Sequence, residues 1–227
     1  MTGPAIAQAL GMARSTVGAI LRRLGLGKLT ALEPKAPVLR YERSLPGEMI
    51  HLDIKKLGRF GIAGHRVTGD RQLGRSRRAG WDFLHVCVDD ASRLAYTEIL
   101  PSERKEDTTA FLQRALAWLG QHGVTVERVM TDNGSAYRSK LFAQALATAQ
   151  ARHVRTRPYT PRTNGKAERF IQTTLREWAY AKPYGSSQER ASAIGPWTDA
   201  YNLHRPHSGI GGITPWTRVN NLLGNDI

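Results

Sequence analysis

Three carboxylates stand where apolar segments end or where a helix begins, and side chains of this type in such places can hold metal ions. Asp53 lies on the apolar segment 49–54, Asp132 closely follows the apolar segment 124–130, and Glu168 falls in the first turn of a predicted helix. Carboxylates that converge from two strands and a helix can hold two divalent cations, the apparatus that cuts and joins phosphodiesters. Taken singly, Asp132 could be a turn former and Glu168 an ordinary first-turn acid. Taken together, the three favour metal-dependent phosphodiester chemistry.

Asp89 and Asp90 are the alternative carboxylates for such a site. They end the strand-like segment 81–89, where aspartate side chains commonly hold the backbone of a turn, and we favour that structural role. His51 stands two residues before Asp53 and could point toward the same site. A histidine packed in the core is the interpretation that we favour for it.

Five ordered motifs resemble the integrase-type transposases of the D,D(35)E class, most closely those of the IS481 insertion-sequence group. The motifs are HLDIKKLGRF, VDDASRLAY, RVMTDNGSAYRS, RTRPYTPRTNGKAERF and YNLHRPHSGIGG, and 168 − 132 − 1 = 35 residues separate the last two carboxylates. The resemblance runs from about Pro4 to Arg218. It implies an α/β protein with an RNase H-like core, Mg²⁺ or Mn²⁺ as cofactor with two ions per site, and DNA transposition as the activity.

The resemblance also implies roles for single residues. Asp53 would bridge both ions, Asp132 would bind one and Glu168 the other. Contacts to DNA would come from the segments around the last two carboxylates, through Asn133, Tyr159, Arg162, Asn164, Lys166, Arg169 and Arg176. Many enzymes of the class carry Lys or Arg seven positions after the glutamate, whereas this chain has Leu175 there. Lys166, Arg169 and Arg176 are therefore the candidates for the basic contact to the donor end.

The composition indicates a polyanionic partner. Lys and Arg number 33 against 19 Asp and Glu, so the formal net charge is +14, which fits double-stranded DNA before an acidic protein. The single cysteine, Cys87, lies in a strand-like run and is expected to be packed rather than reactive. Without an 18-residue apolar run or a signal-peptide pattern, we expect a cytoplasmic protein, associated with the nucleoid in a bacterium.

Residues 1–27 predict a helix-turn-helix that is partial at its N-terminus, because Met1 stands almost at the first visible helix. Two short amphipathic helices flank a glycine turn, with a small residue at Ala7, the turn at Gly11 and a packing residue at Val17. Ser15 or Thr16 is expected to cap the second helix. The residues expected to face DNA are Arg14, Thr16, Arg22 and Arg23. A plain α-hairpin with packing value only is the alternative.

The order of the remaining predicted elements is typical of the RNase H-like fold, with a mixed five-stranded sheet flanked by helices. Strands are expected at 48–57, 81–89, 93–100, 124–131 and 153–156, and helices at 106–121, 139–151 and 168–180. A linker at 28–47 precedes this core at 48–182, and a helical extension at 183–227, interrupted by Gly195-Pro196, follows it. The part of the extension from Trp197 to Trp216 would either contact a second subunit or DNA, or cover one face of the core.

These observations lead to one main hypothesis and two alternatives. The main hypothesis is a transposase that cuts the ends of its insertion element and joins them to target DNA. It would act as a homodimer or a higher oligomer, because two ends must be held together. One alternative is a truncated, non-catalytic DNA-binding regulator of transposition. The other is an RNase H-like nuclease that cuts without joining.

Overall fold

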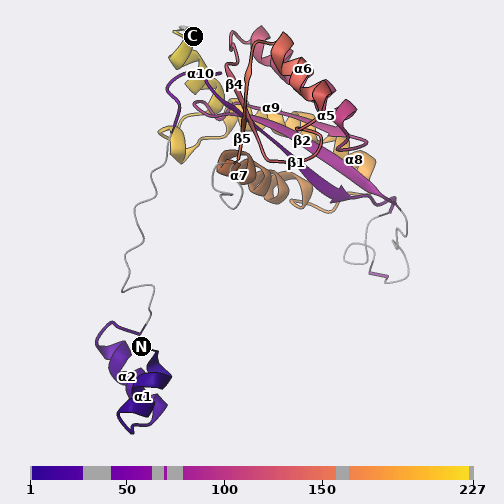
Figure 1. The fold of residues 1–227 in the computed structure, drawn as a ribbon. Coiled ribbons are helices and arrows are strands. Elements are labelled where there is room, and N and C mark those ends of the chain that lie inside the picture. The colour runs from indigo at the N-terminus through magenta and orange to yellow at the C-terminus, as the bar shows by residue number, and fades with distance from the viewer. Residues whose placement is uncertain (1, 28–41, 63–68, 71–78, 157–163, 225–227) are drawn as a thin grey trace. The chain divides into compact units, whose positions relative to one another are not determined.

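The chain divides into two compact units, Met1–Tyr41 and Glu42–Ile227. The structure is a computed structural model, and it describes residues 2–27, 42–62, 69–70, 79–156 and 164–224 (Figure 1). In the described part of the chain, no helix is both long enough and apolar enough to cross a membrane.

The first unit is a pair of helices around a glycine turn. Helix α1 spans Gly3–Ala9 and helix α2 spans Arg14–Arg23. Ala7 and Val17 are its buried residues, and Gly11 adopts a φ of 62°, which a glycine reaches without steric cost. The expectations for these three positions are confirmed. The expected cap is wrong, because α2 already begins at Arg14, preceded by Ala13 with no side-chain bond to the helix.

The second unit is built on the mixed five-stranded sheet that the sequence predicted. Its strands are β1 (Ile50–Gly58), β2 (Trp81–Asp89), β3 (Ala95–Leu100), β4 (Arg128–Thr131) and β5 (Arg152–Arg155). They lie in the order β3-β2-β1-β4-β5. The first three strands are antiparallel, whereas β4 runs parallel to β1 and β5 parallel to β4. The expected strand at 124–131 is shorter than predicted, since the ladder begins only at Arg128.

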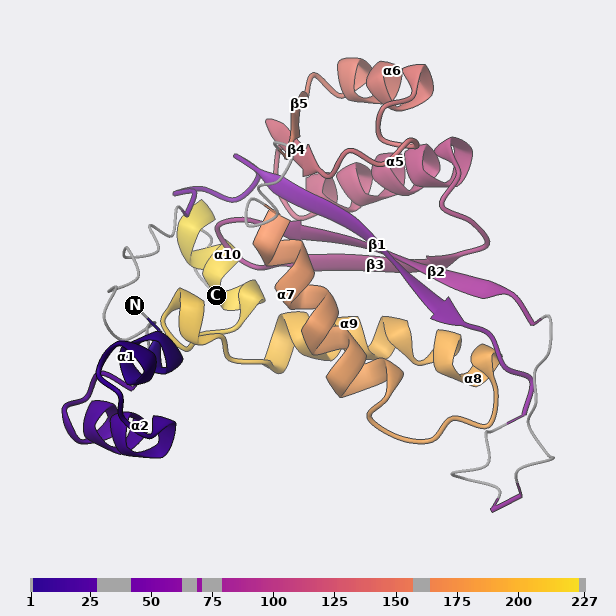
Figure 2. The same ribbon diagram turned by 60° about the horizontal axis from the view of Figure 1, so that its bottom comes forward.

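Helices cover both faces of this sheet (Figure 2). On one face lie α5 (Lys105–Gln121) and α6 (Lys140–Thr148), and α10 (Pro215–Leu223) adds Val219 to the same apolar cluster. On the other face lies α7 (Gly165–Thr174), which continues as a π-helix over Leu175–Ala179. It shares its cluster with α9 (Ile194–His204), which follows the short α8 (Ser187–Ser192). A 3₁₀ turn, Ser208–Ile210, connects α9 to α10.

The alternation of side chains along β1 decides which of them face α7. Ile50 and Leu52 belong to the cluster under α5, whereas Leu57 belongs to the cluster under α7. Because successive side chains of a strand point to opposite faces, His51 and Asp53 share the face of Leu57. The strand therefore presents its carboxylate on the same side of the sheet as α7.

The C-terminal helices belong to the second unit and cover its edge strand. The side-chain amide of Asn202 in α9 accepts a hydrogen bond from the N–H of Ala95 at 2.9 Å and donates one to the carbonyl of the same residue at 2.8 Å. The hydroxyls of Thr97 and Thr198 lie 2.6 Å apart. These bonds satisfy backbone groups of β3 that no further strand pairs, which supports the covering role proposed for this region. Gly195-Pro196 lies in the first turn of α9, where a proline leaves no helical hydrogen bond unmade.

Candidate active site

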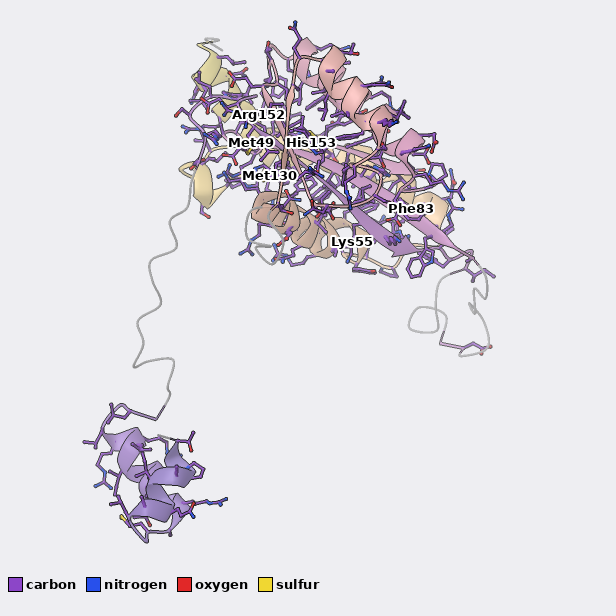
Figure 3. The ribbon with its side chains drawn as sticks, viewed as in Figure 1. Met49, Lys55, Phe83, Met130, Arg152 and His153 are labelled. Carbon is purple, nitrogen blue, oxygen red and sulfur yellow. The ribbon has the colours of Figure 1, made fainter. Side chains whose placement is uncertain are left out.

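The parallel pairing of β1 with β4 leads two of the three predicted carboxylates away from the same end of a ladder. Ile50 pairs with Val129 and His51 with Met130, an offset of 129 − 50 = 79 residues. The ladder ends with this second pair, and Asp53 and Asp132 each follow it by two residues, so both leave the same end of the β1–β4 pairing. Figure 3 labels Met130 of β4 close to Met49, which directly precedes β1. Arg152 and His153 of β5 lie beside them, while Lys55 and Phe83 mark the far part of the β1–β2 pair.

The charge of Glu168 acts on Asp53, as the charge of Asp132 does. It lies in the first turn of α7, which packs against β1 and β2, and its side chain is exposed, as is that of Asp132. Burial, together with the negative charges of Asp132 and Glu168, raises the pKa of Asp53 to about 6, against a hydrogen bond from the N–H of Ile54 that lowers it. The structure thus brings two acidic groups close enough to Asp53 for their charges to act on it.

The turn after β4 needs a glycine because the Asp132 carboxylate folds back on it. The N–H of Gly134 donates to Asp132 Oδ1 at 2.8 Å. A Cβ at position 134 would lie 3.0 Å from that oxygen and 3.4 Å from Cδ2 of Tyr137, so a larger residue would push the carboxylate away. Tyr137 is buried beneath the turn, and burial followed by the charges of Asp53 and Asp132 raises the pKa of its hydroxyl.

The chemistry of these donors fits hard divalent cations, which prefer carboxylate oxygens. Within the described ranges, however, no group of three or more His, Cys, Asp or Glu side chains is already gathered as a metal site. One oxygen of Asp53 and one of Asp132 accept backbone N–H groups in this arrangement. Because Asp132 and Glu168 are exposed, their side chains can change rotamer toward Asp53 without disturbing the core.

Of the two alternative carboxylates, Asp89 has the structural role that the sequence favoured. Its oxygens accept hydrogen bonds from the N–H of Gly47 at 2.8 Å and from the N–H of Ser92 at 2.8 Å, so it holds its own turn and the chain entering β1. Asp90 is also fully buried, but its carboxylate is directed elsewhere. It accepts from the N–H of Arg43 at 2.7 Å and from the side chains of His51 and Lys166.

His51 is the packed histidine that the sequence favoured, with no exposed surface. Its Nε2 lies 2.7 Å from Asp90 Oδ1 and its Nδ1 lies 3.1 Å from Asn164 Oδ1. The amide nitrogen of Asn164 donates to the carbonyl of Leu52 at 3.1 Å. Asn164 is only 4% exposed, so its amide is not available to DNA in this structure. Lys166 pairs with Asp90 Oδ1 at 2.5 Å, which turns the predicted phosphate contact inward.

The other predicted DNA contacts lie at the surface where the structure describes them. Exposed positions are those of Arg14, Thr16, Arg22, Arg23, Asn133, Arg169 and Arg176. The amide of Asn133 donates to the carbonyl of Thr156 at 2.8 Å, and Arg176 pairs with Glu177 at 2.8 Å. Tyr159 and Arg162 lie outside the described residues. Cys87 is packed as expected, and burial raises the pKa of its thiol.

Two family models match the chain, and both describe an integrase core domain. One matches residues 44–161, which is 161 − 44 + 1 = 118 of the 227 residues, and the other matches residues 149–215. The first model alone therefore covers just over half of the chain.

The chain is similar to parts of longer proteins. It is 32% identical over 133 residues to uncharacterized protein K02A2.6 of Caenorhabditis elegans, covering 59% of this chain and 10% of that protein. It is 33% identical over 122 residues to the retrovirus-related Pol polyprotein from transposon TNT 1-94 of Nicotiana tabacum, covering 53% and 9%. Transposase InsD for insertion element IS2D of Escherichia coli K12 is 30% identical over 154 residues, covering 59% and 50%. The matched stretches thus span from a tenth to half of these relatives.

A solved structure has the same fold. The cryoEM structure of the simian T-cell lymphotropic virus intasome, in complex with PP2A regulatory subunit B56 gamma, contains a chain that matches with a TM-score of 0.61 and 20% identity. The match covers 96% of this chain and 70% of that chain, and at this identity it speaks for the fold alone. Because one family model alone matches more than half of the chain and the other matches most of the remainder of the second unit, the chain belongs to the integrase core domain family.

Proposed function

We propose that the chain is a DNA transposase, of the IS481 type, whose Asp53, Asp132 and Glu168 hold a pair of divalent cations. The observation that supports this proposal best is the surrounding of Asp53, whose pKa is raised by burial and by the charges of both Asp132 and Glu168. A half-buried carboxylate beside two further negative charges is costly unless a cation binds there, and a perturbed acid of this kind is a candidate for a functional site.

The three side chains have different tasks in this reaction. Two divalent cations, when bound, would activate the attacking oxygen and stabilise the leaving oxygen of a phosphodiester. Asp53, half-buried on a strand, is the fixed member of the site, whereas Asp132 and Glu168 approach it from a turn and a helix. The exposed Arg169 follows the glutamate directly and would contact a phosphate of the bound strand.

The proposed partners are the ends of an insertion element and a target duplex. The arginines exposed on α2 would hold DNA, and the second unit would carry the chemistry. Since two ends must meet, we propose a homodimer or a higher oligomer on DNA, acting in the cytoplasm at the nucleoid.

The test is a cleavage and strand-transfer assay on labelled duplexes taken from both sides of the gene, with Mg²⁺ or Mn²⁺ supplied. We expect joined products from the native chain and none from Asp132→Asn, which removes a ligand charge and leaves DNA binding intact. Asp199→Asn is the matched control, because Asp199 is an exposed aspartate on α9. It should behave as the native chain does.

The same assay separates the alternatives. Cut but unjoined products from the native chain would favour the nuclease. Binding to the duplexes without any metal-dependent cleavage would favour the non-catalytic regulator. Strong cleavage by Asp132→Asn would refute the assignment of the site.

A further inference from the structure

Four buried or partly buried side chains connect the start of α7 to β1, next to the proposed catalytic carboxylates. They are His51, Asp90, Asn164 and Lys166, called here the α7 anchor. We propose that the α7 anchor sets the position of Glu168 relative to Asp53, so that its members are positioning residues for the reaction. This inference rests on the proposed function, and its test is chosen so that the two can fail separately.

Asp90 is the centre of the α7 anchor. His51 Nε2 lies 2.7 Å and Lys166 Nζ 2.5 Å from the same oxygen, Oδ1, and the N–H of Arg43 donates to Oδ2 at 2.7 Å. The N–H of Asp90 itself donates to the carbonyl of Met49 at 2.9 Å, which holds it to the start of β1. Burial would raise the pKa of this carboxyl, but the hydrogen bonds from His51, Lys166 and Arg43 outweigh it and hold the pKa well below its ordinary value.

Asn164 carries the connection to β1. It occupies the N-cap position of α7, where an asparagine usually bonds its own helix, yet its side chain makes no cap bond. Instead its amide nitrogen donates to the carbonyl of Leu52, directly before Asp53, and its Oδ1 faces the ring of His51. The donor to Leu52 fixes the orientation of the amide, because the opposite orientation would set two oxygens against each other.

These bonds act on the turn that bears Glu168. Glu168 stands 168 − 164 = 4 residues after Asn164, which is one helical turn, so the two lie on the same side of α7. Lys166 lies between them in the chain and ties the same turn to Asp90. The anchor therefore fixes both the height and the rotation of this turn against β1.

The composition of the anchor argues for position rather than for stability alone. Burying a carboxylate with a lysine and a histidine gains little over apolar packing of the same volume, since desolvation offsets the attraction. Hydrogen bonds with fixed directions, in contrast, hold two segments 112 residues apart in the chain, Leu52 and Asn164, in one geometry. Partners of this kind behind metal ligands typically change metal affinity or activity by about 10- to 100-fold when they are removed.

The decisive experiment compares Asp90→Asn with Asp89→Asn. The two aspartates are adjacent and equally buried, but the hydrogen bonds of Asp89 go to Gly47 and Ser92, whereas those of Asp90 go to His51, Lys166 and Arg43. Two quantities are measured: the Mg²⁺ concentration for half-maximal cleavage, and the rise in melting temperature that Mn²⁺ gives to the protein without DNA. We expect Asp90→Asn to raise the Mg²⁺ requirement by about 10-fold or more and to reduce the Mn²⁺ stabilisation. Asp89→Asn should lower the melting temperature and leave both metal responses unchanged.

Lys166 supplies a second comparison that does not depend on either aspartate variant folding. Lys166→Met removes the ion pair with Asp90, whereas Lys166→Arg can restore it, so the arginine variant should recover the Mg²⁺ response and the methionine variant should not. Equal metal responses of Asp90→Asn and Asp89→Asn, or of the two Lys166 variants, would overturn the inference. If the native chain neither cleaves DNA nor responds to Mn²⁺, the proposed function itself has failed.

Discussion

Asp90, which follows β2, and Asp53, on the neighbouring strand β1, have opposite surroundings. Asp90 is buried and receives hydrogen bonds from a lysine, a histidine and a backbone N–H, which lower its pKa. Asp53 is half-buried and receives one bond, from the N–H of Ile54, while two neighbouring acids add to the rise in its pKa. Asp90 is satisfied within the protein. Under the proposed function, a bound cation would offset the negative charges around Asp53.

The difference lies in the charge of their neighbours rather than in burial, because burial also raises the pKa of Asp89, which holds a turn. A carboxylate that is fully paired adds to the stability of the fold and has nothing left to bind. A carboxylate that is desolvated among like charges lowers stability and gains from a cation. The exposed acids Asp132 and Glu168 contribute the like charges that surround Asp53. Substitutions around Asp90 and at Asp53 should therefore change the stability of the protein in opposite directions.

The largest effect is expected at Glu168. Glu168→Gln removes a ligand charge from a surface position, so cleavage should fall on the order of 10³-fold while the melting temperature stays nearly constant. Single-turnover cleavage and calorimetry measure the two. Glu106→Gln is the control, because Glu106 is also an exposed glutamate in the first turn of a helix, α5. Cleavage reduced equally in both variants would contradict the assignment.

A large loss of stability is expected when Asp90 loses a hydrogen-bond partner. His51→Ala leaves a cavity and deprives both Asp90 and Asn164 of a partner, which should cost about 2–4 kcal/mol of unfolding free energy. Urea unfolding measures it. His204→Ala, at an exposed position near the end of α9, should change the free energy by about 0.5 kcal/mol or less. A decrease below about 1 kcal/mol for His51→Ala would mean that the anchor contributes little to the fold.

Substitution of Asp53 should change the free energy of unfolding in the opposite direction. Asp53→Asn removes a charge that the fold disfavours, so in EDTA at pH 7.5 it should stabilise the protein by about 1–2 kcal/mol. The sign follows from the pKa, which rises from 3.8 to about 6 on folding. The ionised carboxylate therefore costs stability fully above the raised pKa, and the cost disappears as pH falls below 3.8. The advantage of the variant should vanish near pH 4, and Mn²⁺ should stabilise only the native chain.

The smallest effect concerns binding apart from chemistry. Arg22→Ala with Arg23→Ala should reduce the slope of log affinity against log salt by up to about 0.9 for each phosphate that the protein no longer neutralises. Both arginines are exposed on α2. Fluorescence anisotropy with labelled duplexes at several salt concentrations gives the slope. Arg104→Ala, an exposed change in the second unit, serves for comparison, and an unchanged slope in the double variant would show that α2 does not bind the DNA backbone.

Much of the architecture could be predicted from local patterns. The alternation along β1, the apolar run before Asp132 and the helical spacing of 106–121 predicted elements that the structure confirms, together with the mixed sheet. The predictions were wrong where the same local pattern is compatible with two structures. Val124 and Val126 are buried, as in a strand, but they precede the ladder because the neighbouring N–H of Glu127 bonds to Gly47. Ser15 and Thr16 were expected to cap a helix that begins before them.

What the sequence determined by itself is the elements that carry the three candidate carboxylates: a strand, the end of a second strand and the first turn of a helix. Those follow from periodicity and turn residues, which act over a few positions of the chain. Which acids are paired was decided only by the tertiary structure. His51 meets Asn164 across 113 residues and Asp90 across 39. No local pattern encodes such pairs, because they form only when the packing of α7 on the sheet brings the partners within hydrogen-bond distance. That packing turned Asn164 and Lys166 from expected DNA contacts into internal ones, and it left Asp53 among like charges.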